Sequence, residues 1–398
     1  MTDIEHSSLV LTDDDLRRIV LGEICDTLSA HFHRHTDFAT QVSFGDDTPL
    51  GAGGLALTRS EADWCLARAS ALFGLGAAAL EAEDIGSIGD CVAAIKARLA
   101  GLPEKMDFLT VGAGGDEVAC VRPMAEILQD AQALAQLLAH RRRIISFVPA
   151  NHFFGFVASI LLPKLMGLLV ADGRGMSALG LRSELQYGDL LVATPTMWRY
   201  LSHTILSAPE NIVGVSYGER LPSDLEDSLR KINIASIKEV YGATETGLVG
   251  WRNSSLEPFC LLPHWRRNET DADEADLIRT TPDGSDSAVA AMDELIWDSD
   301  RMFRLRGRRD GAVQVGGFNV HPARIAYLIE SHPIVERCRI GVNVQRDGVC
   351  RLIAHIQLVE GRDPSEQAMR DIDHWSRKRL RVQERPRLYS FEDKVASA

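Results

Sequence analysis

Residues 240–247, with the sequence VYGATETG, restrict the fold of this chain more than any other stretch. They follow the apolar run 232–237, which we interpret as a buried strand bounded by polar residues. The stretch combines an aromatic ring (Tyr241), a hydroxyl (Thr244) and a carboxylate (Glu245) with two glycines. An aromatic face can stack on a purine, a hydroxyl can donate to a phosphate, and a glutamate can hold Mg²⁺ between phosphates. The stretch therefore predicts a nucleotide site, and an ordinary strand-to-loop turn with a polar tip is the alternative.

The length and charge of the chain limit the classes of protein to which it can belong. At 398 residues it can bury a large core and should form two or more domains. The formal net charge of −13 argues against a general binder of nucleic acid or of anionic membranes, because those proteins need a basic face. The 7 cysteines are scattered without a Cys-x-x-Cys pair, which is typical of a reducing compartment rather than of a cysteine metal site.

The sequence predicts a cytoplasmic protein with no signal peptide and no membrane span. The first residues are acidic and polar, unlike a signal peptide. The longest apolar window, 153–171, is short and is interrupted by Pro163 and Lys164.

Residues 1–104 are expected to be mainly helical. Thr12 can cap a helix whose first turn is acidic, and further helices are predicted over 60–73 and 88–99. Alternate histidines in the run 31–35 (HFHRH) could bind a metal. No Cys, Asp or Glu at ligand spacing accompanies them, so a surface histidine run is the favoured interpretation.

The stretch 108–117 (FLTVGAGGDE) predicts a strand that runs into a glycine-rich loop, followed by a helix over 124–139. Such a loop can turn its N–H groups toward a phosphate, and a flexible turn is the alternative. Further buried strands are predicted over 144–148 and 190–193. Short apolar strands that alternate with helices predict a layered α/β domain.

Residues 240–247 also resemble the Tyr-Gly-x-Thr-Glu signature of the adenylate-forming superfamily, which contains acyl- and aryl-CoA synthetases and peptide-synthetase adenylation domains. Other stretches resemble motifs of this superfamily in the same order along the chain. They are the phosphate loop (110–118), a His-x-x-Gly segment (149–155), a Ser-Gly-Gly-Ala-Pro-Leu segment (213–222), an aspartate (Asp293) fourteen positions before Gly-Arg-x-Asp (307–310), and the start of a small C-terminal domain (313–322). Weak signals in the right order make the resemblance stronger than any one of them alone.

The resemblance implies an α/β fold, with a large layered α/β N-terminal domain and a small α+β C-terminal lid domain. The N-terminal domain would comprise residues 1–309, with its α/β core over 105–309. The lid would comprise residues 310–398 and would turn on Asp310 as a hinge. The elements expected in the lid are a helix over 323–331, hairpin strands over 339–344 and 352–358, and a helix over 364–380.

The chemistry that the resemblance implies is ATP-dependent activation of a carboxylic acid, aryl or acyl, as an acyl-adenylate. Transfer to the thiol of CoA, or to the phosphopantetheine of a carrier protein, would follow. The expected ligands are ATP or AMP and Mg²⁺. The expected partners are a small carboxylic acid and an acyl carrier protein or partner enzyme.

The resemblance also assigns roles to residues. Thr244 and Glu245 would be catalytic, and Glu245 would be the Mg²⁺ ligand. The nucleotide would be contacted by Gly218, Glu219, Tyr241, Gly242, Thr244, Asp293 and Arg308. The substrate pocket would be lined by His152, Phe153 and Tyr217, with Phe154 beside them. A hydrogen-bonded core histidine is the alternative for His152.

The chain departs from the superfamily pattern at two lysines. The phosphate loop has Val118 in place of its lysine, and its Asp116 and Glu117 would repel a triphosphate. The C-terminal lysine of the superfamily lies well beyond the segment 386–391, and the chain stops before that position, with Lys394 expected to point elsewhere. We therefore expect slow adenylation unless a partner chain supplies cations. The alternative function is a catalytically impaired protein that serves as a nucleotide- or acyl-binding partner in a biosynthetic assembly.

Overall fold

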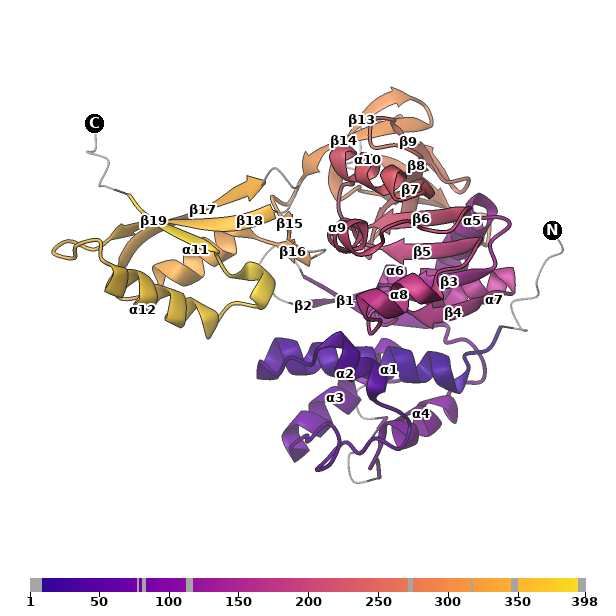
Figure 1. The fold of residues 1–398 in the computed structure, drawn as a ribbon, viewed down its shortest axis with the longest axis horizontal. Helices are drawn as coiled ribbons and strands as arrows, with labels where there is room; N and C mark the ends of the chain where they lie inside the picture. Colours follow the sequence, from indigo (N-terminus) through magenta and orange to yellow (C-terminus); the bar gives the residue numbers. More distant parts are fainter. Residues whose placement is uncertain are drawn as a thin grey trace. The chain divides into compact units, whose positions relative to one another are not determined.

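The computed structural model describes residues 9–76, 79–80, 84–111, 117–270, 275–315, 318–344 and 350–392 (Figure 1). The chain divides into two compact units, the first of Met1–Thr110, Ala119–Ala291 and Trp297–Arg304, the second of Val111–Val118, Met292–Ile296 and Leu305–Ala398. The predicted domain boundary between residues 309 and 310 stays a prediction. Across the described ranges, no helix has the length and apolar character needed to cross a membrane.

The first unit begins with helices, namely α1 (Asp13–Phe32), α2 (Phe38–Ser43), α3 (Arg59–Leu72) and α4 (Ile88–Lys96). The predicted cap at Thr12 is confirmed. Its Oγ1 accepts from Asp15 N at 3.2 Å, while its own N–H donates to the Asp15 carboxylate at 2.8 Å. A buried face of α1, which includes Leu16, Ile19 and Ile24, packs this helix into the core. Burial of each such side chain stabilises the fold by roughly 1.5–3 kcal/mol.

A mixed sheet of nine strands follows among the described residues (Figure 1). Its strands are β3 (Arg143–Ser146), β4 (Leu169–Asp172), β5 (Asp189–Ala193), β6 (Ile212–Tyr217), β7 (Ile234–Ala243), β8 (Gly247–Arg252), β9 (Phe259–Leu261), β13 (Asp293–Ser299) and β14 (Met302–Arg308). They are ordered β13-β14-β9-β8-β7-β6-β5-β3-β4. The block from β4 to β7 is parallel, and β8 and β9 extend it antiparallel. The predicted α/β fold class is confirmed.

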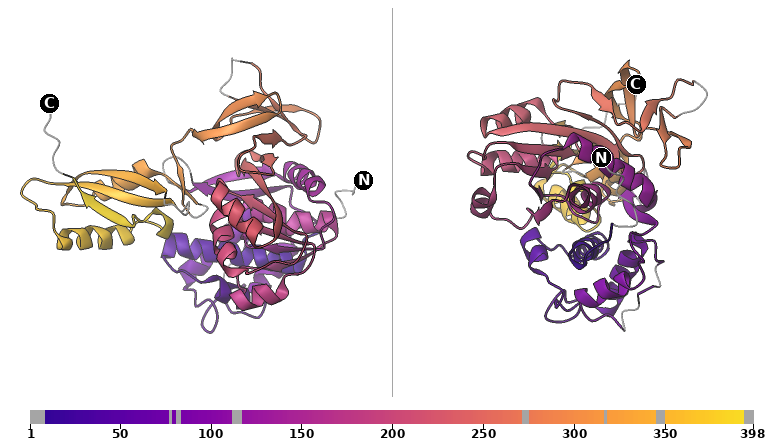
Figure 2. Two further views of the ribbon diagram at one scale, coloured as in Figure 1. Left: turned by 45° about the horizontal axis from the view of Figure 1, so that its top comes forward. Right: turned by 90° about the vertical axis from the view of Figure 1, so that its right-hand side faces the viewer.

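Helices cover both faces of the parallel block (Figure 2). They are α5 (Met124–Leu137), α6 (Phe153–Phe156), the π-helical segment η2 (Val157–Leu161), α7 (Leu162–Met166), α8 (Ala178–Glu184), α9 (Pro195–Thr204) and α10 (Ser223–Lys231). The chain moves outward from β3 to β4 and then back through β5 and β6 to β7. Right-handed crossovers therefore place α8, α9 and α10 on the face opposite to η2. On their face, Leu181, Trp198 and Leu225 form one core with the sheet.

Two small β structures lie outside the nine-stranded sheet. β1 (Lys105–Val111) pairs with β2 (Glu117–Pro123), and β10 (Trp265–Arg267), β11 (Leu277–Thr280) and β12 (Asp286–Val289) form a three-stranded sheet. The predicted glycine-rich loop is thus followed by a strand before α5, not directly by the helix. The strand forms because residues after the loop pair back onto β1.

The second unit has its own core. Its elements after β14 are β15 (Val313–Val315), β16 (Phe318–Val320), α11 (Pro322–Glu330), β17 (Val335–Val344), β18 (Cys350–Leu358), α12 (Glu366–Arg377), the 3₁₀ segment η3 (Val382–Glu384) and β19 (Leu388–Phe391). The predicted hairpin is confirmed, since β17 and β18 pair antiparallel, and β19 joins β18 in parallel. Ile325, Ile340 and Ile372 are among the buried side chains that hold α11 and α12 against this sheet.

Candidate functional site

The polar stretch predicted to bind nucleotide forms a tight turn between β7 and β8. β7 continues through Ala243 and β8 begins at Gly247, so residues 244–246 alone lie between the strands. The strand is longer than the predicted run 232–237, because pairing with β8 extends the ladder to the turn. Two glycines permit this geometry. A Cβ on Gly242 would lie 2.3 Å from Gly247 O, and Gly247 has a φ of +80°.

The carboxylate of Glu245 is held by the strand that leads into the glycine-rich loop. Its Oε1 accepts a 2.7 Å hydrogen bond from Oγ1 of Thr110, one residue before the end of β1. Residues 112–116 of the loop lie outside the described residues, so phosphate binding by this loop stays a prediction. Val118, which replaces the loop lysine, is 48% exposed.

Glu245 fits the role of a magnesium ligand in a site that the substrate completes. In the described parts of the chain, no three His, Cys, Asp or Glu side chains converge into a metal site. Mg²⁺ at nucleotide sites is bound by one or two carboxylates and by substrate phosphates, with waters completing its octahedron. A single half-buried carboxylate beside the hydroxyl of Thr110 matches that donor set.

Tyr241, predicted to stack on adenine, belongs to an aromatic cluster. Its ring centroid lies 5.6 Å from that of Phe303 and 5.7 Å from that of Phe259. Phe259 and Phe303 are themselves stacked at 5.6 Å and nearly fully buried. The cluster fixes the half-buried ring of Tyr241 at the end of β7. Contact with adenine stays a prediction.

Gly218 and Glu219 follow β6 directly, at the carboxyl edge of the parallel strands. Gly218 has a φ of +93°, a conformation that favours glycine. The Glu219 carboxylate accepts from Oγ1 of Thr196, at the start of α9, with distances of 3.1 and 3.2 Å. The ends of β5 and β6 are thereby linked at the edge where open α/β sheets bind ligands.

His152 is not a core histidine. Its side chain is 44% exposed, and Nε2 lies 2.8 Å from Oδ2 of Asp26 in α1. Asn151 Nδ2 donates to the same Asp26 oxygen at 2.8 Å and lies 3.3 Å from Oε2 of Glu23. Sequence reasoning did not connect α1 with this histidine, because 126 residues separate the two partners.

The pair of His152 and Asp26 shifts the pKa of both members. Partial desolvation by the surrounding protein opposes the charged imidazolium, but the Asp26 carboxylate outweighs this and raises the pKa of His152 above its ordinary value. Partial desolvation also opposes the charged Asp26, but His152 and the hydrogen bond from Asn151 lower the pKa of that carboxyl. The geometry therefore favours an ion pair.

The aromatic residues beside His152 separate into two groups. Phe153 is 2% exposed and packs edge-to-face on Phe108 at 5.7 Å. Phe154 instead stacks on Tyr217 with ring centroids 4.0 Å apart and an interplanar angle of 11°. The stack joins the start of α6 to the end of β6, and the role of these residues in a substrate pocket stays a prediction.

Asp293 and Arg308 are brought together by the hairpin of β13 and β14. Asp293 is the first residue of β13 and Arg308 the last residue of β14. The next residue along, Arg309, donates from its N–H to Met292 O at 3.1 Å, which closes this end of the hairpin. The spacing of fourteen positions from Asp293 to Gly307, the residue before Arg308, therefore corresponds to two neighbouring strand ends.

Asp310, the predicted hinge, is bound by its own neighbours. Arg308 donates to it from Nε at 2.9 Å and from Nη2 at 2.5 Å, and Ala312 N donates at 3.0 Å. The hydrogen bonds from Arg308 lower the pKa of the Asp310 carboxyl. Gly311, with a φ of +68°, follows directly. Rotation about Asp310 stays a prediction.

A buried ionic cluster lies behind the turn, and sequence reasoning missed it. We name it the turn-support network, and its members are Arg122, Glu126, Asp130 and Arg279. Asp130 is fully buried, Arg279 is 1% exposed and Arg122 is 8% exposed. A signal was present, since Arg279 interrupts the apolar strand β11 and Asp130 lies at helical spacing among buried residues of α5. A charge on an apolar face needs a buried partner.

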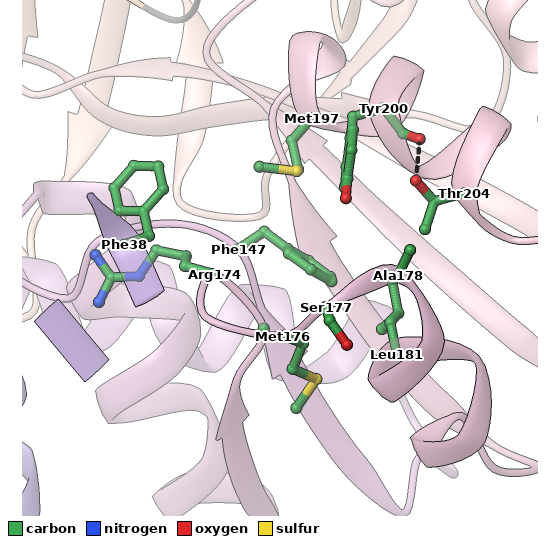
Figure 3. A pocket seen from close by; sticks show the side chains of 11 residues that line it. Phe38, Phe147, Arg174, Met176, Ser177, Ala178, Leu181, Met197, Tyr200 and Thr204 are labelled. Carbon is green, nitrogen blue, oxygen red and sulfur yellow. Dashed lines mark hydrogen bonds between the residues drawn. The ribbon is translucent and has the colours of Figure 1, made fainter. Parts of the chain in front are cut away.

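A cavity of about 230 Å³ opens elsewhere on the first unit (Figure 3). It lies at the carboxyl ends of β3 and β4, beside α8 and α9. Its lining includes Phe147, Met176, Leu181, Met197 and Tyr200. The guanidinium of Arg174 at its side is paired with Asp172 at 2.6 Å. None of the predicted substrate-pocket residues lines this cavity.

Comparison with known proteins identifies relatives of the chain. No family model matches it. It is 31% identical over 303 residues to a 4-coumarate–CoA ligase of Halorhodospira halophila, a match that covers 76% of the chain and 74% of the relative. It is 30% identical over 272 residues to a 4-coumarate–CoA ligase of Cereibacter sphaeroides, covering 67% of the chain and 62% of the relative.

Solved structures share the fold at lower identity. A malonyl-CoA ligase, in a complex with methylmalonyl-CoA and AMP, has a TM-score of 0.58 and 21% identity, with 73% of this chain and 71% of that chain covered. An o-succinylbenzoate CoA synthetase of Bacillus subtilis has a TM-score of 0.62 and 17% identity, with 78% and 71% covered.

Proposed function

Because the chain belongs to the adenylate-forming acyl-CoA synthetase superfamily, we propose that it activates a small carboxylic acid with ATP and transfers the acyl group to a thiol. The observation that carries the proposal is the turn between β7 and β8. Thr244 and Glu245 lie in this turn between two paired strands, and the Thr110 hydroxyl donates to the Glu245 carboxylate.

In the first step a carboxylate oxygen of the acid attacks the α-phosphorus of ATP. A bond from oxygen to phosphorus forms, the bond to the leaving pyrophosphate breaks, and the acyl-adenylate results. Thr244 would donate to a phosphate oxygen. Glu245 would hold a Mg²⁺ ion, which would supply positive charge against the phosphates. Tyr241 contacts adenine, while Asp293 and Arg308 contact the ribose. The protein contributes mainly positioning and electrostatic stabilisation.

In the second step a thiolate attacks the acyl carbonyl, a thioester forms, and AMP leaves. CoA is the proposed acceptor, because the relatives are named as CoA ligases. An aryl acid of the 4-coumarate type is the proposed substrate. The stacked rings of Phe154 and Tyr217 support an aromatic acid, since planar apolar groups pack well against such rings.

Carboxylate-dependent ATP–pyrophosphate exchange tests the proposal. The panel should compare 4-coumarate, benzoate, acetate and malonate at fixed Mg²⁺. We expect exchange that requires an acid and is fastest with an aryl acid. If no acid of the panel supports exchange while calorimetry still detects AMP binding, the catalytically impaired binding protein is favoured instead.

A further inference from the structure

We propose that Arg122 and Arg279 are positioning residues, which set the main chain of the turn at 244–247 and thereby the place of Glu245. The inference rests on the proposed function only for its effect on activity. The contacts themselves belong to the turn-support network, and neither arginine is one of the residues proposed to contact substrate.

Arg279 ties the turn to α5 through several bonds at once. Its Nη2 donates to Asp130 Oδ1 at 2.9 Å and to Glu126 O at 2.8 Å. Its Nη1 donates to Thr246 O at 3.3 Å, and Gln129 Oε1 accepts from Nε and Nη2 at 3.2 and 3.0 Å. A planar guanidinium with five N–H groups can make this set of bonds, but an ammonium cannot reproduce its directions.

Arg122 holds the same turn from β2. Its Nη1 donates to Glu245 O at 2.7 Å, and its Nη2 donates to Thr246 O at 3.2 Å. Nη2 also pairs with Glu126 Oε2 at 2.8 Å. Arg122 therefore links the main chain of Glu245 to the strand that follows the glycine-rich loop.

The turn is closed against this network with little free space. Leu248 N donates to Asp130 Oδ2 at 2.9 Å. A Cβ on Gly247 would lie 2.4 Å from that oxygen and 2.9 Å from Arg279 Nη1. Any shift of either group would therefore displace the backbone at Gly247, two residues from Glu245.

The charges within the turn-support network explain why it can hold the turn without neutralising the carboxylate of Glu245. Arg122 and Arg279 are matched by Glu126 and Asp130 within the network. Both arginines contact the turn through main-chain carbonyl groups, whereas the Glu245 carboxylate points to the Thr110 hydroxyl. The negative charge of Glu245 is thus available to a cation while its backbone is fixed.

The test compares Arg279→Lys and Arg122→Lys with the control Arg143→Lys. Arg143 forms a similar two-bond pair with Asp189, at 3.1 and 2.7 Å, but at the start of β3. Hydrogen exchange of the amides in residues 240–250 is measured first, because it reports the turn without any substrate. We expect this exchange to be faster by about tenfold in the two network variants and unchanged in the control.

Pyrophosphate exchange as a function of Mg²⁺ is measured on the same proteins. We expect the network variants to need more Mg²⁺ or to lose activity by about 10–100-fold, with the KM for the acid little changed. Unchanged amide exchange in both variants, or an equal loss of activity in Arg143→Lys, would overturn the inference. If the wild type itself shows no pyrophosphate exchange, the proposed function fails, and the amide exchange still decides the positioning role.

Discussion

Oγ1 of Thr110 lies 2.7 Å from Oε1 of Glu245, although 135 residues separate them in the chain. The contact joins the end of β1 to the turn between β7 and β8. It means that the strand before the glycine-rich loop selects one orientation of the Glu245 carboxylate.

Thr110→Val should therefore lower Mg²⁺-dependent pyrophosphate exchange by about 10–100-fold, the usual cost of losing a group that orients a metal ligand. Valine keeps the shape of the side chain but removes the hydroxyl. Thr110→Ser keeps the hydroxyl and should stay near wild-type activity. Equal activity of the valine variant and the wild type would show that the contact does not matter.

Glu245→Gln should leave AMP binding nearly intact while lowering Mg²⁺-dependent activity by orders of magnitude, because an amide is a poor Mg²⁺ ligand and carries no charge. Calorimetry with AMP and pyrophosphate exchange measure the two effects. A general collapse of the melting temperature would instead identify Glu245 as a structural residue.

Asp293→Ala should weaken AMP binding by about tenfold or more, because a carboxylate that accepts from ribose hydroxyls is lost. Calorimetry on the variant and the wild type measures this. Equal affinities would rule out the ribose role of Asp293, and no binding to either protein would rule out the nucleotide site.

Local patterns predicted much of the fold but little of what supports the site. The cap at Thr12 and the hairpin of β17 and β18 follow from short-range rules of capping and alternation. Strand β2 was missed because residues 110–118 were matched as one loop, although the β-branched Val118 and Val121 favour a strand in this stretch.

Long-range partners account for the rest. The pairing of Arg279 with Asp130 spans 149 residues, and the contact of His152 with Asp26 spans 126. Spacing along the chain carries no information about such pairs. Burial of a lone charge in an apolar segment indicates that a partner exists, but only the fold identifies it.

Gly247→Ala should destabilise the protein more than Gly284→Ala. Both glycines have a left-handed φ, +80° and +84°, so each alanine variant should cost roughly 1–2 kcal/mol of strain. A Cβ on Gly284 meets open space, whereas one on Gly247 would lie 2.4 Å from Asp130 Oδ2, which adds about 1–3 kcal/mol of overpacking. Urea unfolding of the two variants measures the difference. Equal midpoints would mean that the turn accommodates the Cβ without loss of stability.

The ion pair of His152 and Asp26 should make stability depend on pH in a defined window. The pKa of His152 is raised above 6.5, so its contribution is fully present below that pH and is lost as the pH rises through the higher folded-state pKa. The pKa of Asp26 is lowered below 3.8, so its contribution is present above that pH and is lost as the pH falls through the lower value. The pair therefore stabilises the fold most between these two limits.

Asp26→Asn should accordingly lower the free energy of unfolding near pH 5.5 and do so less at pH 8. Both side chains are about half exposed, so solvent screening limits the effect to at most about 1 kcal/mol. Glu23 and Arg174 also act on His152, in opposite directions, and both remain in the variant. Urea midpoints at the two pH values, with the double variant Asp26→Asn, His152→Gln as control, measure the effect. The double variant should differ from Asp26→Asn most at acidic pH, because the single variant leaves a charged imidazolium without its carboxylate there. A loss of stability in Asp26→Asn that does not depend on pH would show that packing, rather than charge, holds the pair.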